Sequence, residues 1–168
     1  MIRKKICLLG APGVGKTSLV RRFVSETFSD DYLTTIGVKI ERRALTVHGT
    51  ELQLLVWDIH GEEGSLAIAP SFLRGAAGFL LVIDGSRHET AMTVVELGQR
   101  LQAMDTAGPV VVALNKADLV SDWSPIEAAL DKADTPIAGR TITSAKTGSG
   151  VEDAFTLLGA SILAPSAT

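Results

Sequence analysis

The chain has 168 residues, of which 46% are hydrophobic and 5% aromatic, and its formal net charge is −3. This length predicts a single domain over residues 1–168 with a full, mainly aliphatic core. The small negative charge argues against nucleic acid as a partner, because a face that binds nucleic acid is normally basic.

The cysteine content and the apolar stretches constrain where the protein works. Cys7 is the only cysteine, so the chain forms no intramolecular disulfide, which fits a reducing compartment, and Cys7 itself is expected in the core. Every apolar stretch is shorter than the roughly 18 to 20 residues that span a bilayer, and residues 164–168 offer no cysteine for a prenyl group. The sequence therefore predicts a cytoplasmic protein without a direct membrane anchor.

The N-terminal segment leads from a strand into a phosphate-binding loop. The apolar run 6–9 predicts the strand, and residues 10–17 read Gly-Ala-Pro-Gly-Val-Gly-Lys-Thr, which fits the pattern G-x-x-x-x-G-K-S/T. The glycines allow backbone angles at which successive amides converge on phosphate oxygens, and the positive end of the next helix adds to the attraction. Lys16 supplies a cation for the outer phosphates and Thr17 a hydroxyl ligand for Mg²⁺. The predicted contacts to a nucleoside phosphate are Gly13, Val14, Gly15, Lys16, Thr17 and Ser18.

A helix and a hairpin are predicted after this loop. Residues Lys16–Ser25 place apolar side chains such as Leu19 and Phe23 on one face, as an amphipathic helix requires. Residues 38–47 and 52–58 flank a short turn and predict an antiparallel hairpin. The first of these strands is partly charged, so it is expected at an edge of the sheet.

The middle of the chain alternates strands with a helix. Continuous apolar runs at 79–84 and 110–115 are typical of central parallel strands that are buried on both faces. Between them, Val94, Leu97 and Leu101 repeat at three- and four-residue spacing, which predicts a helix. This alternation favours a parallel sheet with helices on both faces.

The C-terminal part predicts two more helices and a strand. A short helix is expected to begin near Pro125, because proline is tolerated at the first helical position. Residues 141–143 predict the sixth strand, and Ser149 with Glu152 matches a capping box at the start of the last helix. The sequence thus predicts an α/β, doubly wound P-loop NTPase fold: a six-stranded, mostly parallel sheet with one antiparallel edge strand from the hairpin, and five helices.

The loops after the fifth and sixth strands indicate which base is bound. Asn115-Lys116-Ala117-Asp118 follows one strand and Ser144-Ala145-Lys146 the other, at the same edge as the phosphate loop. The two oxygens of Asp118 can accept from N1–H and the exocyclic amine of guanine, whereas adenine lacks this pair of donors. Lys116 can lay its stem along the base, Asn115 can tie the two loops together, and the Ala145 amide can reach the guanine oxygen. The motifs predict a guanine nucleotide.

These motifs and three further segments resemble a small GTPase of the Ras superfamily, closest to its Ras and Rab branches, over essentially the whole chain. Residues 28–37 resemble the first switch, and residues 57–63 resemble the second, where the family usually has Trp-Asp-Thr-Ala-Gly-Gln-Glu. Residues 72–78 resemble the stretch that leads into the fourth strand of Rab-like members. The resemblance implies a molecular switch that binds GTP or GDP with Mg²⁺, hydrolyses GTP, and contacts effector and regulatory proteins through the two switch segments.

The resemblance also assigns roles to individual residues. Thr35 would complete the Mg²⁺ shell with Thr17, and Asp58 would hold the metal through water, which suits a cation that prefers hard oxygen ligands. Phe28 would cover the edge of the guanine ring. Loss of the terminal phosphate would release both switch segments. The residues implied in catalysis are Lys16, Thr35, Gly61, whose amide would contact the terminal phosphate, and Glu62.

Two of the departures from the family pattern bear on hydrolysis and on activation by a partner. Glu62 stands where the family has the glutamine that orients the attacking water. An ionised glutamate can accept from this water but cannot donate to the phosphate, which predicts slow hydrolysis unless Glu62 points away as a solvated switch residue. Pro12 lacks an N–H, but the amides that cradle phosphates begin at the next residue, so nucleotide binding is expected to survive. The Pro12 ring stands where the arginine of an activating protein would approach.

The sequence leaves a second class of function open. The alternative to a GTPase is a GTP-binding interaction module with negligible hydrolysis. Glu62 and Pro12 are the two residues that support this alternative. A nucleoside or small-molecule kinase would need a lid and an acceptor pocket, for which the chain has no obvious room. His60 precedes Gly61, whereas the water-positioning histidine of some translational GTPases follows the glycine, so His60 is expected to face solvent or a partner.

Some apolar residues have two interpretations. Residues 66–68, Phe72 and Leu73 either pack on the sheet or form a surface for a partner. Trp123 is either a local packing residue or an exposed contact. His48 and His88 have no motif around them and are expected at the surface.

Overall fold

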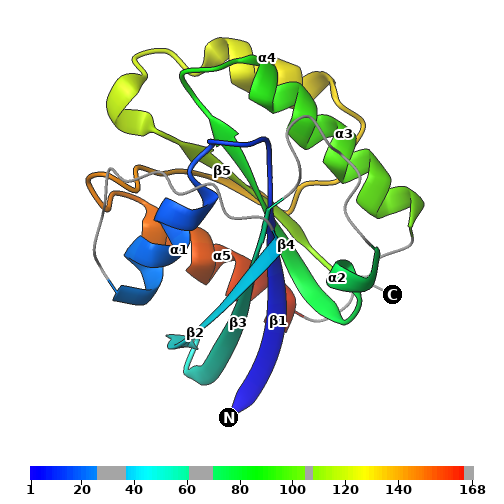
Figure 1. Cartoon of the computed structure of the whole chain (residues 1–168), viewed down its shortest axis with the longest axis vertical. Coiled ribbons are helices and arrows are strands. Elements are labelled where there is room, and N and C mark those ends of the chain that lie inside the picture. The colour runs from blue at the N-terminus through cyan, green and yellow to red at the C-terminus, as the bar shows by residue number, and fades with distance from the viewer. Residues whose placement is uncertain (26–36, 61–69, 105–107, 165–168) are drawn as a thin grey trace.

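The structure is a computed structural model that describes residues 1–25, 37–60, 70–104 and 108–164. In these ranges six strands form one sheet in the order β2-β3-β1-β4-β5-β6, and only β2 runs antiparallel to its neighbour (Figure 1). The strands are β1 (Ile2–Leu9), β2 (Gly37–Val47), β3 (Thr50–His60), β4 (Ala76–Asp84), β5 (Val110–Asn115) and β6 (Gly139–Ile142). The helices are α1 (Lys16–Ser25), α2 (Pro70–Leu73), α3 (Glu89–Ala103), the 3₁₀ turn η1 (Ala117–Leu119), α4 (Ser124–Lys132) and α5 (Val151–Leu163). The predicted doubly wound α/β fold is confirmed.

Helices cover both faces of the sheet, as Figure 1 shows. On one face α1 and α5 bury a hydrophobic cluster that includes Ile6, Leu80 and Leu158. On the other face α3 and α4 bury a second cluster, in which Cys7 and Ile126 are 0% and 1% exposed. The predicted core position of Cys7 is confirmed, and burial raises the pKa of its thiol to about 11. The continuous apolar strands arise because both of their faces are covered.

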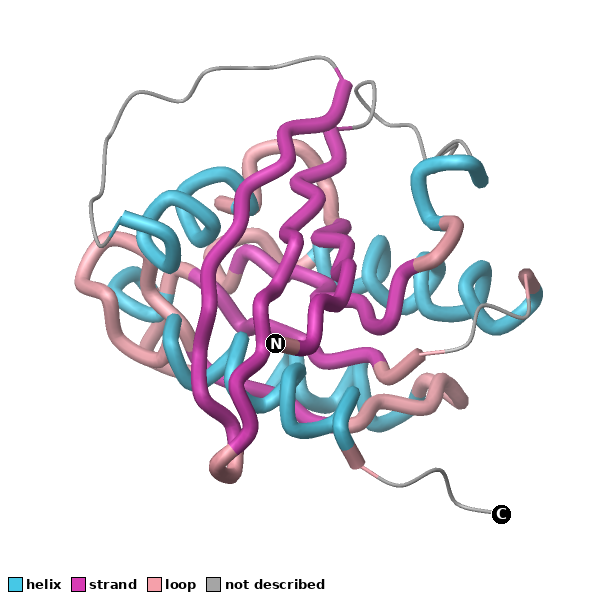
Figure 2. Tube along the Cα trace, turned by 90° about the horizontal axis from the view of Figure 1, so that it is seen from below, coloured by secondary structure: helices cyan, strands magenta, loops and turns pink. Residues whose placement is uncertain are grey.

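The hairpin forms as its sequence predicts. Figure 2 shows β2 and β3 as two long strands side by side, and their pairing runs from Gly37 opposite His60 to Val47 opposite Thr50. The turn residues His48 and Gly49 both have positive φ, at 48° and 79°, which matches the twist of a two-residue hairpin turn. The charged strand β2 lies at the edge of the sheet, also as predicted.

The start of α5 corrects the sequence prediction. Ser149 does not cap the helix: the N-cap is Gly150, at φ 71°, and no side chain caps it. A Cβ at Gly150 would lie 2.0 Å from the Ile142 carbonyl, so a glycine is needed for the chain to turn this closely against β6. Glu152 pairs instead with Arg43 of β2, whose guanidinium also lies over the ring of Phe23. The Glu152 side chain, which a capping box would use at the start of α5, thus joins α5 to β2.

Several strand boundaries also differ: β3 (Thr50–His60) and β4 (Ala76–Asp84) extend beyond the predicted 52–58 and 79–84, and β1 and β6 are shifted. β1 begins at Ile2, where the apolar run predicted a start at residue 6, because Ile2 to Lys5 pair with residues 52–55 of β3. β6 spans Gly139–Ile142 and not 141–143, and its residues are only partly buried or exposed. Pairing with a neighbouring strand sets both boundaries, and a local hydrophobic pattern does not report such pairing.

Candidate functional site

The phosphate loop connects the carboxyl end of β1 to the first turn of α1, as predicted. Gly13 and Gly15 have φ of 76° and 103°, a region that residues with a Cβ rarely adopt. A Cβ at Gly15 would lie 2.4 Å from the Asn115 side-chain nitrogen, and one at Gly10 would lie 2.7 Å from the Val82 carbonyl oxygen. The loop therefore needs these glycines both for its turn and for its close approach to β4 and β5.

Lys16 is buried at the centre of this loop. Its side chain is 6% exposed, and its Nζ donates to the carbonyls of Gly10 at 2.9 Å and Ala11 at 3.2 Å. Burial lowers the pKa of Lys16 to about 8, partly opposed by the negative charge of Asp58 and reinforced by the positive charge of Arg87. A buried ammonium with two carbonyl partners favours an anion beside it, which a phosphate would supply.

Thr17 and Asp58 meet next to the loop. The Thr17 hydroxyl donates to Asp58 Oδ2 at 2.6 Å, which joins the start of α1 to the carboxyl-terminal part of β3. Asp58 is completely buried. A hydroxyl and a carboxylate are hard oxygen donors, so this pair fits the chemistry of Mg²⁺.

The two predicted base loops come together at the ends of β5 and β6. Asn115 is 1% exposed; its amide donates to the Val14 carbonyl at 2.9 Å and its oxygen accepts from Thr143 at 3.0 Å. Asn115 thus ties the base loops to the phosphate loop, which extends its predicted role. The Ser144 hydroxyl donates to Asp118 Oδ1 at 2.7 Å. This bond fixes one oxygen of the Asp118 carboxylate.

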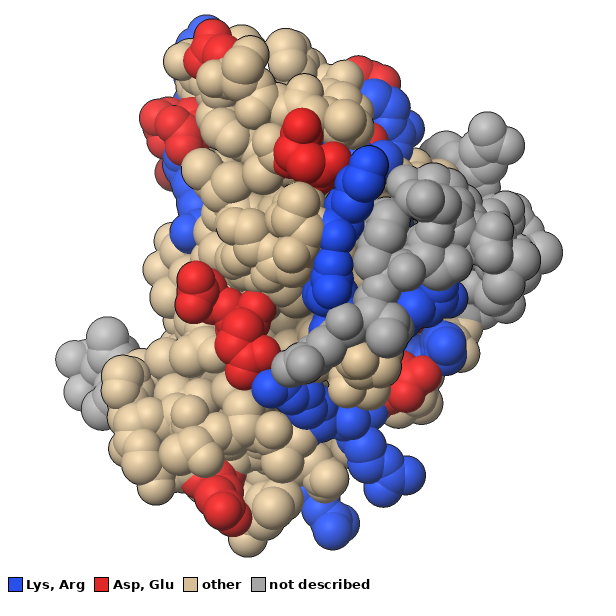
Figure 3. All heavy atoms as spheres, turned by 90° about the vertical axis from the view of Figure 1, so that its left-hand side faces the viewer, with Lys and Arg blue, Asp and Glu red and all other residues tan. Residues whose placement is uncertain are grey.

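The second base loop is fastened to α1 by a residue that the sequence did not single out. Arg22 donates from Nε to the Ala145 carbonyl at 2.9 Å and from a second nitrogen to the Lys146 carbonyl. Ala145 is 5% exposed, whereas Lys146 is exposed. Figure 3 shows the face of the molecule that carries α1 and β2, where a band of basic side chains is flanked by acidic ones. Nothing in the local sequence marks Arg22, which reads as one more polar residue on the outer face of an amphipathic helix.

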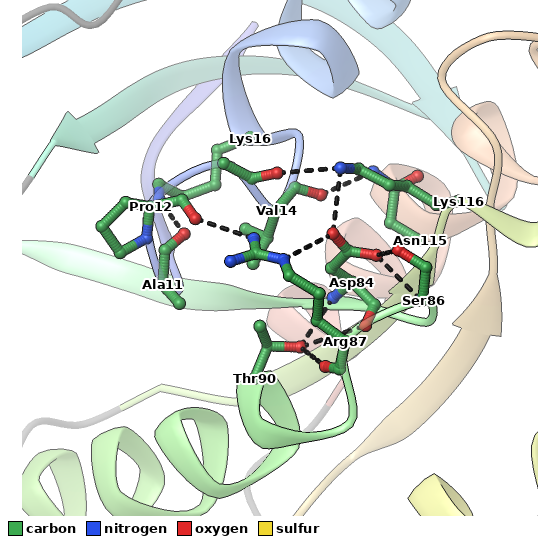
Figure 4. A network of polar contacts seen from close by, with 11 residues as sticks. Ala11, Pro12, Val14, Lys16, Asp84, Ser86, Arg87, Thr90, Asn115 and Lys116 are labelled. Carbon is green, nitrogen blue, oxygen red and sulfur yellow. Dashed lines mark hydrogen bonds and ion pairs between the residues drawn. The ribbon is translucent and has the colours of Figure 1, made fainter. Parts of the chain in front are cut away.

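The loop from β4 to α3 adds a polar network that sequence reasoning also missed (Figure 4). Asp84, the last residue of β4, is 1% exposed and accepts from Lys116 Nζ at 2.9 Å and from Arg87 Nε at 3.0 Å. Ser86 donates to the other Asp84 oxygen from its amide and its hydroxyl, at 2.9 and 2.6 Å. Burial by itself raises the pKa of Asp84, but the bonds from Ser86, Lys116 and Arg87 outweigh it and lower the pKa to about 2. Asp84 therefore stays ionised.

Some of the predicted site residues lie in the described part of the chain and others do not. Phe28, Thr35, Gly61 and Glu62 lie outside the described residues, as do residues 66–68. Ser18 lies in the first turn of α1, half-buried. Leu73 is 4% exposed and packs with Phe72 on the cluster under α3 and α4, so this part of the apolar group packs on the sheet.

Trp123, His48 and His88 can be placed, whereas the side chain of His60 lies outside the described part of the chain. Trp123 packs against the same cluster, and a Cβ at Gly85 would lie 2.4 Å from its ring, so Trp123 is a packing residue. His48 and His88 are exposed, as predicted. Among the described residues, no helix combines the length and the apolar character needed to cross a membrane.

The arrangement of the phosphate loop and the two base loops is typical of one class of protein. A glycine loop with a buried lysine, beside two further loops at the carboxyl edge of a doubly wound sheet, is the nucleotide site of a P-loop protein. Residues 5–164 match the sequence profile of the Ras family. The chain is 34% identical over 157 residues to Ras-related protein Rab-1A of Dictyostelium discoideum, which covers 90% of this chain and 76% of that protein. It is 35% identical over 153 residues to Ras-related protein Rab-22A of Canis lupus familiaris, with coverage of 90% and 79%. The chain belongs to the Ras family and is a Ras/Rab-like small GTPase.

Proposed function

We propose that this chain binds GTP and GDP with Mg²⁺, hydrolyses GTP slowly, and acts as a guanine-nucleotide-dependent switch. The observation that carries the proposal is the meeting of two chemically different subsites at one edge of the sheet. Buried Lys16 favours phosphate, and Asp118, held by Ser144, favours a base with two adjacent donors. Asn115 bonds to both the phosphate loop and the second base loop, so one ligand can bridge the two subsites.

Magnesium fits the oxygen donors beside the phosphate loop. Thr17 and Asp58 would hold the ion, with Thr35 as the further ligand that the family resemblance implies. When bound, Mg²⁺ would neutralise charge on the nucleotide phosphates. Lys16 adds a fixed positive charge from the protein side, and the loop amides add partial positive charge.

Slow hydrolysis follows from Glu62. A glutamine in this position can accept from the attacking water and donate to the terminal phosphate at the same time, whereas an ionised glutamate only accepts. The extra negative charge also opposes the transition state, in which charge spreads over the phosphate oxygens. Effector and regulatory proteins would bind through the two switch segments, as expected for this family. The cytoplasmic location remains a prediction.

Nucleotide analysis and single-turnover kinetics test this proposal. The nucleotide that copurifies with the protein is identified by chromatography, and guanine nucleotide is expected. Protein loaded with GTP is then followed as GTP converts to GDP, for the wild type, Glu62→Gln and the neighbouring control Glu63→Gln. Glu62→Gln is expected to speed hydrolysis by roughly tenfold or more, because it restores the missing donor. Glu63→Gln is expected to stay within about twofold of the wild type.

Other outcomes separate the alternatives. Copurifying ATP would overturn the guanine assignment. A wild-type rate indistinguishable from that of GTP free in buffer would favour the interaction module, which binds GTP and does not turn it over. Equal rates for the wild type and Glu62→Gln would show that Glu62 is not in the catalytic position.

A further inference from the structure

Three consecutive carbonyls of the phosphate loop are each held by a side chain from another loop. Arg87 donates to the Pro12 carbonyl at 2.8 Å, and Lys116 donates to the Gly13 carbonyl at 3.0 Å. Asn115 donates to the Val14 carbonyl at 2.9 Å. The three donors come from two loops, since Arg87 lies between β4 and α3 while Asn115 and Lys116 lie at the end of β5 (Figure 4).

The direction of a carbonyl fixes the direction of the next amide. In a trans peptide the C=O and the following N–H point to opposite sides, and all peptide bonds in the described residues are trans. Holding the carbonyls of Pro12, Gly13 and Val14 on the outer side of the loop therefore turns the amides of the following residues to its inner side. The Val14 amide has this direction. It donates to the Ala11 carbonyl at 3.4 Å, and the same carbonyl accepts from Lys16 at the centre of the loop.

Arg87 itself is fixed from behind by a buried anion. Its Nε donates to Asp84, which is 1% exposed and is further held by Ser86. The buried hydroxyl of Thr90 donates to the Arg87 carbonyl at 2.8 Å and accepts from the Asp84 amide at 3.0 Å, which fixes the backbone of this loop. The second side of the guanidinium reaches the phosphate loop, where a Cβ on Gly13 would lie 3.4 Å from it. The planar fork of arginine suits such a bridge between two acceptors.

We propose that Arg87 is a positioning residue for nucleotide binding: it bridges the Asp84 carboxylate and the Pro12 carbonyl, and thereby holds the Gly13 amide toward the phosphates. The proposal rests on the guanine-nucleotide binding put forward above. It gives Pro12 a role through its carbonyl, which proline retains although it has no N–H. Arg87 contacts the phosphate loop through the Pro12 carbonyl, whereas Lys116, which shares the Asp84 carboxylate with Arg87, belongs to the first base loop.

The test measures how fast the protein releases GDP that carries a fluorescent N-methylanthraniloyl group. Arg87→Ala is expected to release this GDP about tenfold faster than the wild type, because one charge-assisted bond to the loop is lost. The matched control is Arg140→Ala, which removes the exposed Arg140–Asp131 pair elsewhere on the surface and should stay within about twofold of the wild type. Arg87→Lys is expected to fall between Arg87→Ala and the wild type, because an ammonium lacks the planar fork.

A second readout separates positioning from a general loss of structure. The preference for GDP over inosine diphosphate, which lacks the exocyclic amine, should be the same in Arg87→Ala and the wild type, because the base contacts stay intact. A release rate for Arg87→Ala within twofold of the wild type would overturn the proposal. So would full restoration by Arg87→Lys, which would indicate long-range charge alone, or an altered base preference. If Arg87→Ala does not fold, Arg87→Gln is measured against the same criteria. A wild type that binds no guanine nucleotide would defeat the proposed function instead.

Discussion

The phosphate loop and the base loops are built in different ways. The phosphate loop is one continuous segment, and side chains from other loops hold its backbone carbonyls. The base loops lie 26 residues apart in the sequence at Asp118 and Ser144, and they present a side chain that another side chain holds. Phosphate oxygens accept from any amide, so backbone suffices for them. A base is told from another base by its pattern of donors and acceptors, which requires a chosen side chain.

This difference predicts that the two halves fail in different ways when they are changed. A change in the phosphate loop should weaken every nucleotide alike, because all share the same phosphates. A change at Asp118 should alter which nucleotide is preferred.

The largest effect is expected for Gly15→Ala. A Cβ there would lie 2.4 Å from the Asn115 side-chain nitrogen at a φ of 103°, so the bond from Asn115 to Val14 must break and the loop must change its turn. We expect the affinity for fluorescent GDP and for the inosine analogue to fall by at least about a hundredfold, a loss of ~2.7 kcal/mol in each case. Gly49→Ala is the control, because Gly49 also has positive φ but nothing lies within 4 Å of its Cβ position. A hundredfold loss for one nucleotide only would contradict the proposed division between the two halves.

Asp118→Asn should have a smaller and selective effect. Asparagine presents one acceptor and one donor in place of two acceptors, so it cannot accept from both guanine donors. The affinity for GDP is expected to fall by about ten- to a hundredfold, since hydrogen bonds to a charged group contribute roughly 1.5 to 3 kcal/mol. Xanthosine diphosphate, whose base offers a carbonyl in place of the exocyclic amine, should bind the variant better than the wild type. Competition titrations against fluorescent GDP measure both, and equal losses for the two nucleotides would contradict base recognition by Asp118.

The pH dependence of binding should report Lys16 in the phosphate half. The pKa of Lys16 is lowered to about 8 in the nucleotide-free protein, so the ammonium loses its proton as the pH rises above 8. A bound phosphate favours the charged form, so binding takes up a proton there, and the affinity should fall by up to about tenfold per pH unit. The stability of the nucleotide-free protein should depend on pH in the opposite direction: it rises with pH, whereas the affinity for nucleotide falls. Unfolded Lys16 keeps its proton up to a pKa near 10.5, so this group raises the free energy of unfolding as the pH rises from 8 to 10.5.

Affinities for fluorescent GDP measured between pH 7 and 9 test this prediction. Lys16→Arg should lose the pH dependence above pH 8 even if its affinity is lower, because an arginine stays charged throughout this range. The surface variant Lys132→Arg should keep the wild-type slope. An unchanged slope in Lys16→Arg would assign the titration to another group.

Local sequence was sufficient where the determinant is a short segment. The glycine loop, the amphipathic face of α1 and the turn of the β2–β3 hairpin all form as predicted, because backbone freedom and hydrophobic spacing act within a few residues. The capping box predicted at Ser149 was wrong because contacts between distant residues overrode the local pattern: Gly150 approaches Ile142 closely, and Glu152 pairs with Arg43.

The sequence by itself determined the fold class, the phosphate loop and the two motifs predicted to recognise the base, because each is a contiguous motif or a repeating apolar pattern. Only the tertiary structure decided which contacts hold the phosphate loop and the two base loops together. Arg22, Asp84 and Arg87 carry no local signal, and they act because strand order places the ends of β4, β5 and β6 beside the phosphate loop. The chemistry of recognition is local in this chain, and its rigidity comes from contacts between residues that are distant in the sequence.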